Sequence, residues 1–192
     1  MNLSQFGFTE GINEIIAITK SEDGLNAAPI GIIVENANGK TAKIKLFPSH
    51  TKENIEKGSP LWANINFDPI IFVLAAFEDP SIDYYISVDP PILKGSYAYC
   101  EFKCEPEDDI VNLELINGKV LNLRLRAVNR GFNALIEACI HATRYKLGME
   151  HLKGKIEYYG EIIQKCGSKK EKDAYRLLLK FIKLDTEFKS LG

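Results

Sequence analysis

The period of the hydrophobic residues changes at Arg130 and Gly131. Before this point, apolar residues tend to alternate with polar ones, as in β-strands with one buried face. After it, they recur every three or four residues, which is the period of an amphipathic α-helix. The first helical face contains Phe132, Leu135, Ile136, Cys139, Ile140, Thr143 and Leu147. The change predicts an α+β protein with a mainly antiparallel β domain at 1–129 and a helical region at 130–192.

Short strands separated by turn-forming residues fill most of the first region. We predict strands at 12–19, 26–35, 42–47, 61–66, 97–105, 111–116 and 119–128. Asn117-Gly118, a strong two-residue hairpin signal, separates the last two. Residues 51–57 and 70–77 are expected to be short helices, and the proline-rich segment 78–95 a loop. Six or seven antiparallel strands at this spacing predict a small barrel.

Two further helical stripes follow the first. The middle stripe contains Leu152, Ile156, Tyr159, Ile163 and Cys166. Ser168 and Glu171 have the spacing of a capping box, which predicts where the last helix begins. Its apolar positions are Ala174, Leu177 or Leu178, Phe181, Leu184 and Phe188. We therefore expect a C-terminal helical hairpin packed on the barrel or on a partner subunit.

Composition and charge exclude several classes of protein. Lys and Arg number 24 against 26 Asp and Glu, so a net charge of −2 gives no general reason to bind nucleic acid. The longest apolar run, 70–77, is far shorter than the roughly 20 residues of a membrane-spanning helix, so we expect no membrane partner. Residues 1–6 lack the features of a secretory signal, which favours a cytoplasmic location. The four scattered cysteines are then expected to be reduced and to serve as small apolar residues.

Small residues interrupt the apolar strand at 26–31, where the sequence reads Asn-Ala-Ala-Pro-Ile-Gly. Because these side chains are short, a flat or anionic ligand could approach the backbone closely. The same pattern is also typical of an edge strand with a bulge. The residues alone leave both interpretations open.

Hydroxyl, imidazole and amide groups gather at 47–54, where a predicted strand leads into a predicted helix. Free backbone N–H groups at a helix start can bind an anion such as phosphate. The alternative is that Ser49 and Thr51 only cap the helix. No dinucleotide-binding fingerprint, Walker loop or zinc-protease motif accompanies this segment.

A polar line runs opposite the apolar face of the first long helix, with Arg130, Asn133, Glu137, His141 and Arg144 at helical spacing. Such a line is usually solvated, and Glu137 with His141 would form an ordinary i,i+4 pair. A subunit contact or the charged edge of a pocket is the alternative. Two side chains do not make a zinc site.

Four segments in this order, 11–19, 26–31, 49–54 and 62–65, resemble the FMN-binding split-barrel superfamily, especially its flavin reductase and flavoredoxin branch. With 126–127 and 130–144 added, the chain is most similar to a group of uncharacterised archaeal proteins. These combine this barrel with a helical C-terminal region. The similarity covers nearly the whole chain.

This resemblance implies a Greek-key split β-barrel, a homodimer, and FMN held near the subunit interface. It implies that one set of residues lies beside the isoalloxazine ring or the ribityl chain, namely Asn26, Ala27, Ala28 and Pro29. A second set would surround the phosphate: Ser49, His50, Thr51 and Asn54. Asn64 would support the ribityl hydroxyls. Here the resemblance and the chemistry of the two polar segments point to the same pairing.

Three functions are consistent with the sequence. The first is an FMN-dependent oxidoreductase of the flavin reductase type that acts on a small-molecule redox substrate, with chemistry supplied by the flavin. The second is a non-catalytic module that binds flavin and recruits a protein partner. The third is an interaction protein without flavin. Flavin uptake separates the third from the others, and turnover separates the first from the second.

Overall fold

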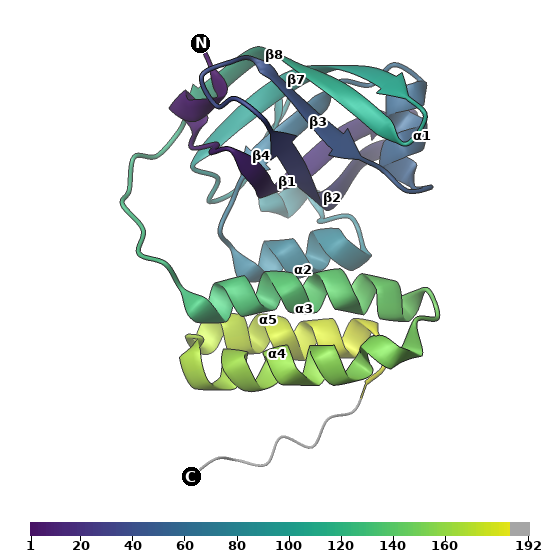
Figure 1. Ribbon diagram of the computed structural model, residues 1–192, viewed down its shortest axis with the longest axis vertical. Coiled ribbons are helices and arrows are strands. Elements are labelled where there is room, and N and C mark those ends of the chain that lie inside the picture. The colour runs from purple at the N-terminus through teal and green to yellow at the C-terminus, as the bar shows by residue number, and fades with distance from the viewer. Residues whose placement is uncertain (185–192) are drawn as a thin grey trace. The chain divides into compact units, whose positions relative to one another are not determined.

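The structure is a computed structural model that describes residues 1–184. The chain forms two compact units (Figure 1). The barrel unit consists of Met1–Phe67 and Glu78–Leu125, and the helical unit of Asp68–Phe77 and the chain from Arg126 onward. The helical unit therefore takes one helix from the middle of the barrel sequence, a segment that the predicted boundary at residue 130 assigns to the β domain.

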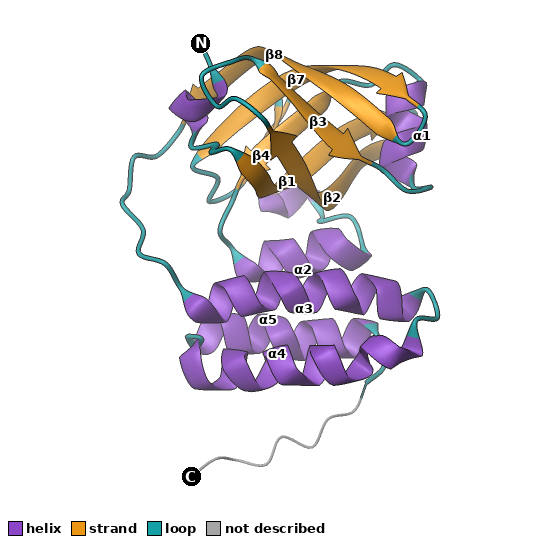
Figure 2. Cartoon of the chain, in the orientation of Figure 1, coloured by secondary structure: helices purple, strands orange, loops and turns teal. Residues whose placement is uncertain are grey.

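Six antiparallel strands close the barrel in the order β1, β2, β3, β8, β7, β4 (Figure 2). These strands are β1 (Gly11–Ser21), β2 (Gly24–Val34), β3 (Thr41–Lys45), β4 (Leu61–Ile65), β7 (Ala98–Glu107) and β8 (Ile110–Val120). A short 3-10 helix, η1 (Leu3–Phe6), contacts β7 and β8, and α1 (His50–Glu56) contacts β1, β2 and β7. The predicted α+β split barrel is confirmed.

Alternate residues of each strand point into the barrel, as the two-residue period requires. The inner face includes Ile15, Ala17, Ile32, Val34, Ile44, Leu61, Ala63, Phe102 and Leu113. All of these are buried, so the barrel has its own apolar core.

One edge of β2 is only partly paired. β1 and β2 pair over their whole length, from Gly11 with Val34 to Ser21 with Gly24. In contrast, the described pairing of β2 with β3 is at Ile33 and Lys43. The edge of β2 that faces away from β1 is therefore not covered by a strand before Ile33. This edge belongs to the segment 26–31 that the sequence singled out.

The segment 78–95 was predicted to be a loop, and that prediction was wrong. It contains a helical turn, η2 (Ile82–Tyr84), and a two-stranded sheet of β5 (Tyr85–Val88) and β6 (Pro91–Leu93). Pro90 stands in the turn and Pro91 is the first residue of β6, a strand position at which proline is tolerated. The prolines therefore mark a hairpin and do not exclude one.

The prediction of a hairpin turn at Asn117-Gly118, with a separate strand at 119–128, was also wrong. β8 runs through these two residues, and the turn lies near Asp108, whose φ is 55°. A β-carbon at Gly118 would lie 2.8 Å from both the Phe6 ring and the Tyr99 carbonyl oxygen. Glycine is needed here for close packing within a strand and not for a turn.

Four helices and one 3-10 turn make up the helical unit: α2 (Pro69–Phe77), α3 (Arg130–Lys146), η3 (Glu150–Leu152), α4 (Lys153–Cys166) and α5 (Lys169–Phe181). Their core includes Val73, Leu135, Ala138, Ile156, Ile163, Tyr175 and Leu178. The helices predicted at 70–77 and after Arg130 are confirmed, while Phe188 lies outside the described residues. Within residues 1–184, no helix is long and apolar enough to cross a membrane.

The polar line predicted along α3 is not solvated throughout. His141 is buried, and its ring stacks on Tyr159 of α4 with centroids 5.7 Å apart. α3 contacts α2, α4 and α5, so its buried face is wider than the apolar stripe and includes Ala134 and Ala138. Leu147, at the end of that stripe, is 81% exposed. The expectation of a solvated His141 is therefore corrected.

Side-chain caps begin α3 and α5. The Asn129 carboxamide oxygen accepts hydrogen bonds from the N–H groups of Gly131 and Phe132, at 2.9 and 3.1 Å. Ser168 and Glu171 form the predicted capping box. The Asn129 Nδ2 also donates to Glu171 Oε1 at 3.3 Å, so the two helix starts support each other.

Gly160→Ala in α4 is expected to destabilise the protein. A β-carbon at this position would lie 2.3 Å from the Tyr175 hydroxyl, which itself donates to the Ile156 carbonyl at 2.9 Å. We expect a loss of about 1–3 kcal/mol in the free energy of unfolding. The matched control is Gly154→Ala in the same helix, where no atom lies within 4 Å. There we expect a gain of up to about 1 kcal/mol. Urea denaturation of both variants measures the difference, and equal effects would contradict the packing described.

Candidate functional site

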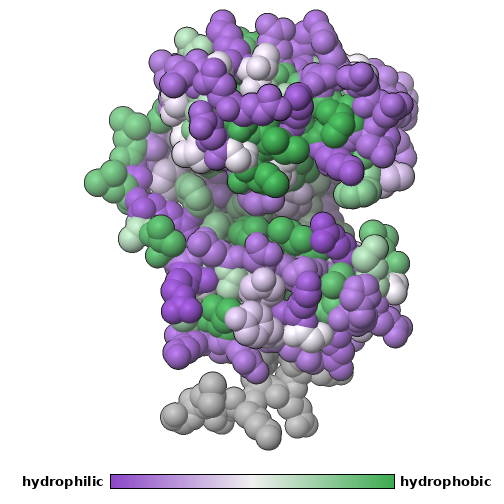
Figure 3. All heavy atoms as spheres, in the orientation of Figure 1, coloured by the Kyte–Doolittle hydropathy of each residue, from purple (hydrophilic) through white to green (hydrophobic). Residues whose placement is uncertain are grey.

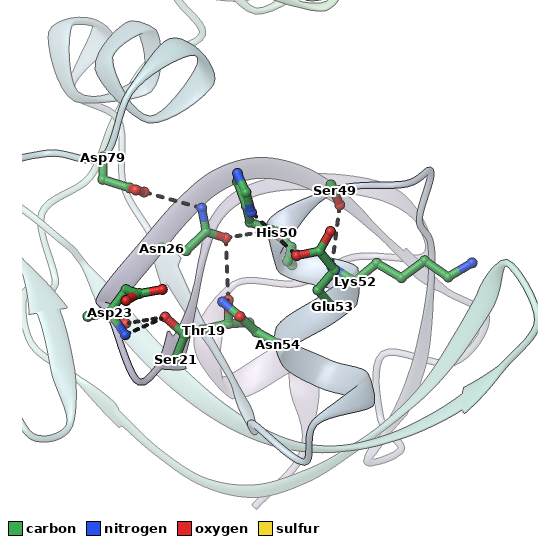
Figure 4. Close-up of polar contacts among 12 residues, drawn as sticks. Thr19, Ser21, Asp23, Asn26, Ser49, His50, Lys52, Glu53, Asn54 and Asp79 are labelled. Atoms are coloured by element: carbon green, nitrogen blue, oxygen red, sulfur yellow. Dashed lines mark hydrogen bonds and ion pairs between the residues drawn. The ribbon is translucent and has the colours of Figure 1, made fainter.

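Polar side chains from two strands and one helix form a hydrogen-bonded network at one end of the barrel (Figure 4). The Thr51 hydroxyl of α1 donates to the Asn26 Oδ1 of β2 at 2.9 Å. The Asn54 Nδ2 of α1 donates to the Thr19 hydroxyl of β1 at 3.0 Å. Thr19 in turn makes a longer contact, 3.4 Å, with Asn26 Oδ1. We call Thr19, Asn26, Thr51 and Asn54 the amide network.

Local structure explains why these side chains meet. Thr19 and Asn26 are directly opposite each other, just before the turn that joins β1 to β2. Thr51 and Asn54 are three residues apart and therefore share one face of α1. Thr19, Thr51 and Asn54 are buried. Because polar groups are stable in such a place only when paired, the network fixes α1 against the strand ends.

Asp79 extends this network to the edge of β2. Its Oδ1 accepts the Asn26 Nδ2 at 3.2 Å and the backbone N–H of Ala27 at 2.7 Å. The N–H of Ala27 points away from β1. Because backbone groups two residues apart in a strand point to the same side, the backbone N of Pro29 also points away from β1. Pro29 has no N–H group, which suits an uncovered edge. Asp79 therefore holds one end of the open edge in place.

Ser49 and His50 lie at the start of α1 and are exposed. The Ser49 Oγ accepts the N–H of Lys52 at 3.3 Å and so acts as the helix cap. His50 Nδ1 is 3.5 Å from Glu53 Oε2. The Lys52 side chain extends away from the amide network in Figure 4, and its ammonium group contacts Asp109 at 3.0 Å.

Asn64 is not part of the amide network. It is fully buried on β4, where its Oδ1 accepts from the Leu93 N–H at 2.9 Å and the Ser96 hydroxyl at 3.0 Å. Its Nδ2 donates to the Pro91 carbonyl at 3.2 Å. These bonds attach the β5–β6 hairpin to β4.

The structure thus joins the two segments that the sequence paired, through the hydrogen bond between Thr51 and Asn26. Ala27, Ala28 and Pro29 continue the same strand from Asn26. Sequence reasoning missed Thr19 and Asp79. Thr19 could have been identified from the sequence, because it is a polar residue at the end of an otherwise apolar strand. Asp79 lies 53 residues from Asn26 in the chain, and no local pattern predicts such a contact.

Cysteine and metal chemistry receive no support from the described residues. Burial raises the pKa of Cys104 to about 11 and of Cys139 to about 12, and raises the pKa of Cys100 still further. These thiols are therefore protonated at neutral pH, and all four cysteines are free. Within residues 1–184, no group of three His, Cys, Asp or Glu side chains is placed to hold a metal ion.

A surface hollow of about 270 Å³ lies elsewhere in the barrel unit, beside β3 and β8. Its lining includes two exposed ion pairs, Lys43 with Glu35 and Lys103 with Glu105, and none of the predicted site residues. Exposed ion pairs of this kind are ordinary surface features. The amide network, with its buried and mutually bonded polar groups, is the stronger candidate site.

Comparison with solved structures gives an extensive match. An FMN-bound DUF447 protein from the archaeon Methanosarcina mazei is 39% identical, with a TM-score of 0.82. The match covers 94% of this chain and 100% of that one. Two flavin enzymes match less well. The NADH:FAD oxidoreductase SgcE6 of Streptomyces globisporus is 10% identical over 62% of this chain and 81% of its own, with a TM-score of 0.45. The styrene monooxygenase flavin reductase of Pseudomonas putida is 15% identical over 62% and 84%, with a TM-score of 0.43. At these scores the two enzymes add nothing to the functional argument.

Family models match both parts of the chain. The N-terminal domain model of the DUF447 proteins, described as proteins of unknown function, matches residues 13–134. The C-terminal DUF447 model matches residues 129–180. No curated protein matches the chain significantly. The expected likeness to archaeal proteins with this barrel and a helical C-terminal region is confirmed. The chain belongs to the DUF447 family.

Proposed function

We propose that this protein binds FMN at the amide network and the open edge of β2. The observation that carries the proposal is the FMN-bound relative, which is 39% identical over 94% of this chain. The structure adds a site whose chemistry suits the cofactor. It offers an uncovered strand edge with short side chains for a planar ring, and hydroxyl and amide groups nearby for the polar chain and phosphate.

Asn26, Ala27, Ala28 and Pro29 would lie beside the ring or the ribityl chain. In support, Asn26 is held from two sides, by Thr51 and by Asp79, so its amide has a fixed orientation before any ligand binds. The side chains of the next three residues are small. Ala28 and Pro29 are partly exposed, whereas Ala27 is buried with its N–H bonded to Asp79. A preorganised site of this kind loses little entropy when the ligand binds.

Ser49, His50, Thr51 and Asn54 would surround the phosphate, and they divide into two pairs. Thr51 and Asn54 are buried and bonded to the strands, so their part is to fix α1. Ser49 and His50 are exposed at the start of the helix, where they can donate to an anion. We therefore assign direct phosphate contact to Ser49 and His50, and positioning to the other two.

Asn64 stays a predicted contact of the ribityl hydroxyls. The hydrogen bonds it makes already occupy both lone pairs of its Oδ1 and one N–H of its Nδ2. One amide N–H remains for a ligand. Its main contribution to the site would be the attachment of the β5–β6 hairpin.

We also propose that the protein is a flavin-dependent oxidoreductase of the flavin reductase type, acting on a small redox substrate. Bound FMN supplies hydride and electron transfer, and the protein supplies orientation and exclusion of water. The described site offers no activated nucleophile, because its network consists of neutral hydroxyl and amide groups with one carboxylate. The alternative is a non-catalytic flavin-binding module.

A homodimer completes the proposal. The connection between β8 and α3 leaves Leu123 and Val128 88% and 84% exposed, and Leu125 fully exposed. Hydrophobic spheres are visible along the left edge of Figure 3, where Figure 1 shows this connection. Leu123 and Leu125 have strand spacing, and exposed apolar residues grouped in this way mark contact surfaces. A second copy of the chain would cover them.

Ser49→Asp is expected to weaken FMN binding about 10- to 100-fold, because it removes a hydrogen bond to the phosphate and adds a repelling charge. Aspartate is also a good helix cap, so the stability of the barrel should not change. Riboflavin, which lacks the phosphate, is the control ligand and should bind both proteins equally. Fluorescence titration with both flavins measures the effect. An equal loss for both would contradict a phosphate contact at Ser49.

The FMN-loaded protein is expected to oxidise NADH or NADPH faster than the same concentration of free FMN does. The protein contributes by holding the flavin in one orientation. Absorbance at the nicotinamide band follows the rate, and Ser49→Asp at a limiting FMN concentration serves as the control with a reduced rate. Retained FMN without acceleration would favour the non-catalytic module.

The double variant Leu123→Asp, Leu125→Asp is expected to be monomeric where the wild-type protein is dimeric. Two charges buried in an apolar contact are strongly unfavourable. Light scattering coupled to size exclusion measures the mass. Leu147→Asp, at a comparably exposed leucine of the helical unit, should leave the dimer intact. A wild-type monomer would contradict the homodimer directly.

A further inference from the structure

Two buried donors of the barrel unit have no acceptor among the described residues. They are the indole Nε1–H of Trp62 and the hydroxyl of Tyr85. Their residues are only 5% and 8% exposed. A buried donor without a partner costs about 1–3 kcal/mol, so native proteins rarely retain one without a reason. Neither residue belongs to the amide network.

Trp62 lies on the same sheet surface as the predicted flavin-binding edge. Ile18 of β1 pairs with Ala27 of β2 on one side and with Trp62 of β4 on the other. Directly paired residues point to the same face of a sheet. Trp62 is therefore two strands, or about 10 Å, from Ala27.

Tyr85 reaches the same face from the β5–β6 hairpin. It pairs with Leu93, whose N–H donates to Asn64 of β4. Asn64 and Trp62 are two residues apart and share one face of β4. The hairpin thus covers the face that carries Trp62, and Tyr85 is one of its buried members.

Asp79, at the edge of β2, acts on Tyr85 through its charge. Burial raises the pKa of the Tyr85 phenol to about 12, and the negative charge of Asp79 adds to the effect. The phenol is therefore protonated at neutral pH and remains a donor. Asp79 itself uses one carboxylate oxygen to hold Ala27 and Asn26, and it makes no described hydrogen bond to Tyr85. The unpaired hydroxyl is thus within electrostatic range of the carboxylate that holds the predicted ring-binding edge.

We propose that the Tyr85 hydroxyl donates a hydrogen bond to the ring system of the bound flavin. The inference rests on the proposed FMN site and adds a contact that the sequence did not indicate. The isoalloxazine ring carries carbonyl oxygens and ring nitrogens, which are the acceptors that a buried phenol lacks. The desolvation cost of the unpaired hydroxyl in the free protein is offset when the ring binds.

Tyr85→Phe tests the proposal, because it removes the hydroxyl and keeps the aromatic ring. We expect FMN and riboflavin to bind about 3- to 10-fold more weakly, and by the same factor, since the lost contact is to the ring they share. The melting temperature of the flavin-free variant should be unchanged or higher, because an unpaired buried group is lost. Tyr84→Phe, at the neighbouring and less buried tyrosine, is the matched control and should change neither quantity.

Each outcome of the titration decides between alternatives. A Tyr85→Phe protein that binds both flavins as tightly as the wild type overturns the proposal and leaves the FMN site standing. Unchanged binding is also the result expected if a water molecule between Tyr85 and Asp79 accepts the hydrogen bond of the phenol. Weaker binding of FMN alone would place the hydroxyl at the phosphate and also overturn it. A clear fall in the melting temperature would show a structural role. If the wild-type protein binds neither flavin, the proposed function itself fails and this inference fails with it.

Discussion

The carboxamide of Asn26 is the group on which the candidate site depends. Its oxygen accepts from Thr51 of the helix and contacts Thr19 of the neighbouring strand, while its nitrogen donates to Asp79. One side chain thereby links β1, β2, α1 and the segment that leads into the β5–β6 hairpin. Since an amide both donates and accepts, no apolar or singly charged side chain could make the same set of bonds. The arrangement is fixed without a ligand, which is what a preorganised binding site requires.

Much of the fold follows from local patterns in the sequence. The change of period at Arg130 predicts the helical unit, and the capping box at Ser168 and Glu171 predicts the start of α5. The errors arose where a residue serves a distant contact. Gly118 reads as a turn residue, yet it is small because Phe6 packs against it. His141 has the spacing of a surface residue, yet its ring is buried against Tyr159 of α4. Local propensity carries no information about such neighbours.

The residues of the candidate site were likewise predictable from the sequence only in part. The segments 26–31 and 49–54 each show unusual polar or small residues, and their meeting follows from the resemblance to split-barrel flavoproteins. Asp79, Trp62 and Tyr85 could not be predicted, because their importance lies in a hydrogen bond across 53 residues or in a missing partner. Whether a buried donor has an acceptor depends on its neighbours in the folded protein, which the sequence does not show. In the proposed function, these groups belong to the surface of the barrel unit at which FMN binds.

Flavin retention tests the central claim most directly. The absorption spectrum of the purified protein is recorded after incubation with FMN and desalting, in the flavin bands near about 375 and 450 nm. We expect these bands to remain with the protein at one flavin per chain, and to be lost when Asn26 is replaced by leucine, which has a similar size but no amide. A wild-type protein that emerges colourless from desalting would contradict the account.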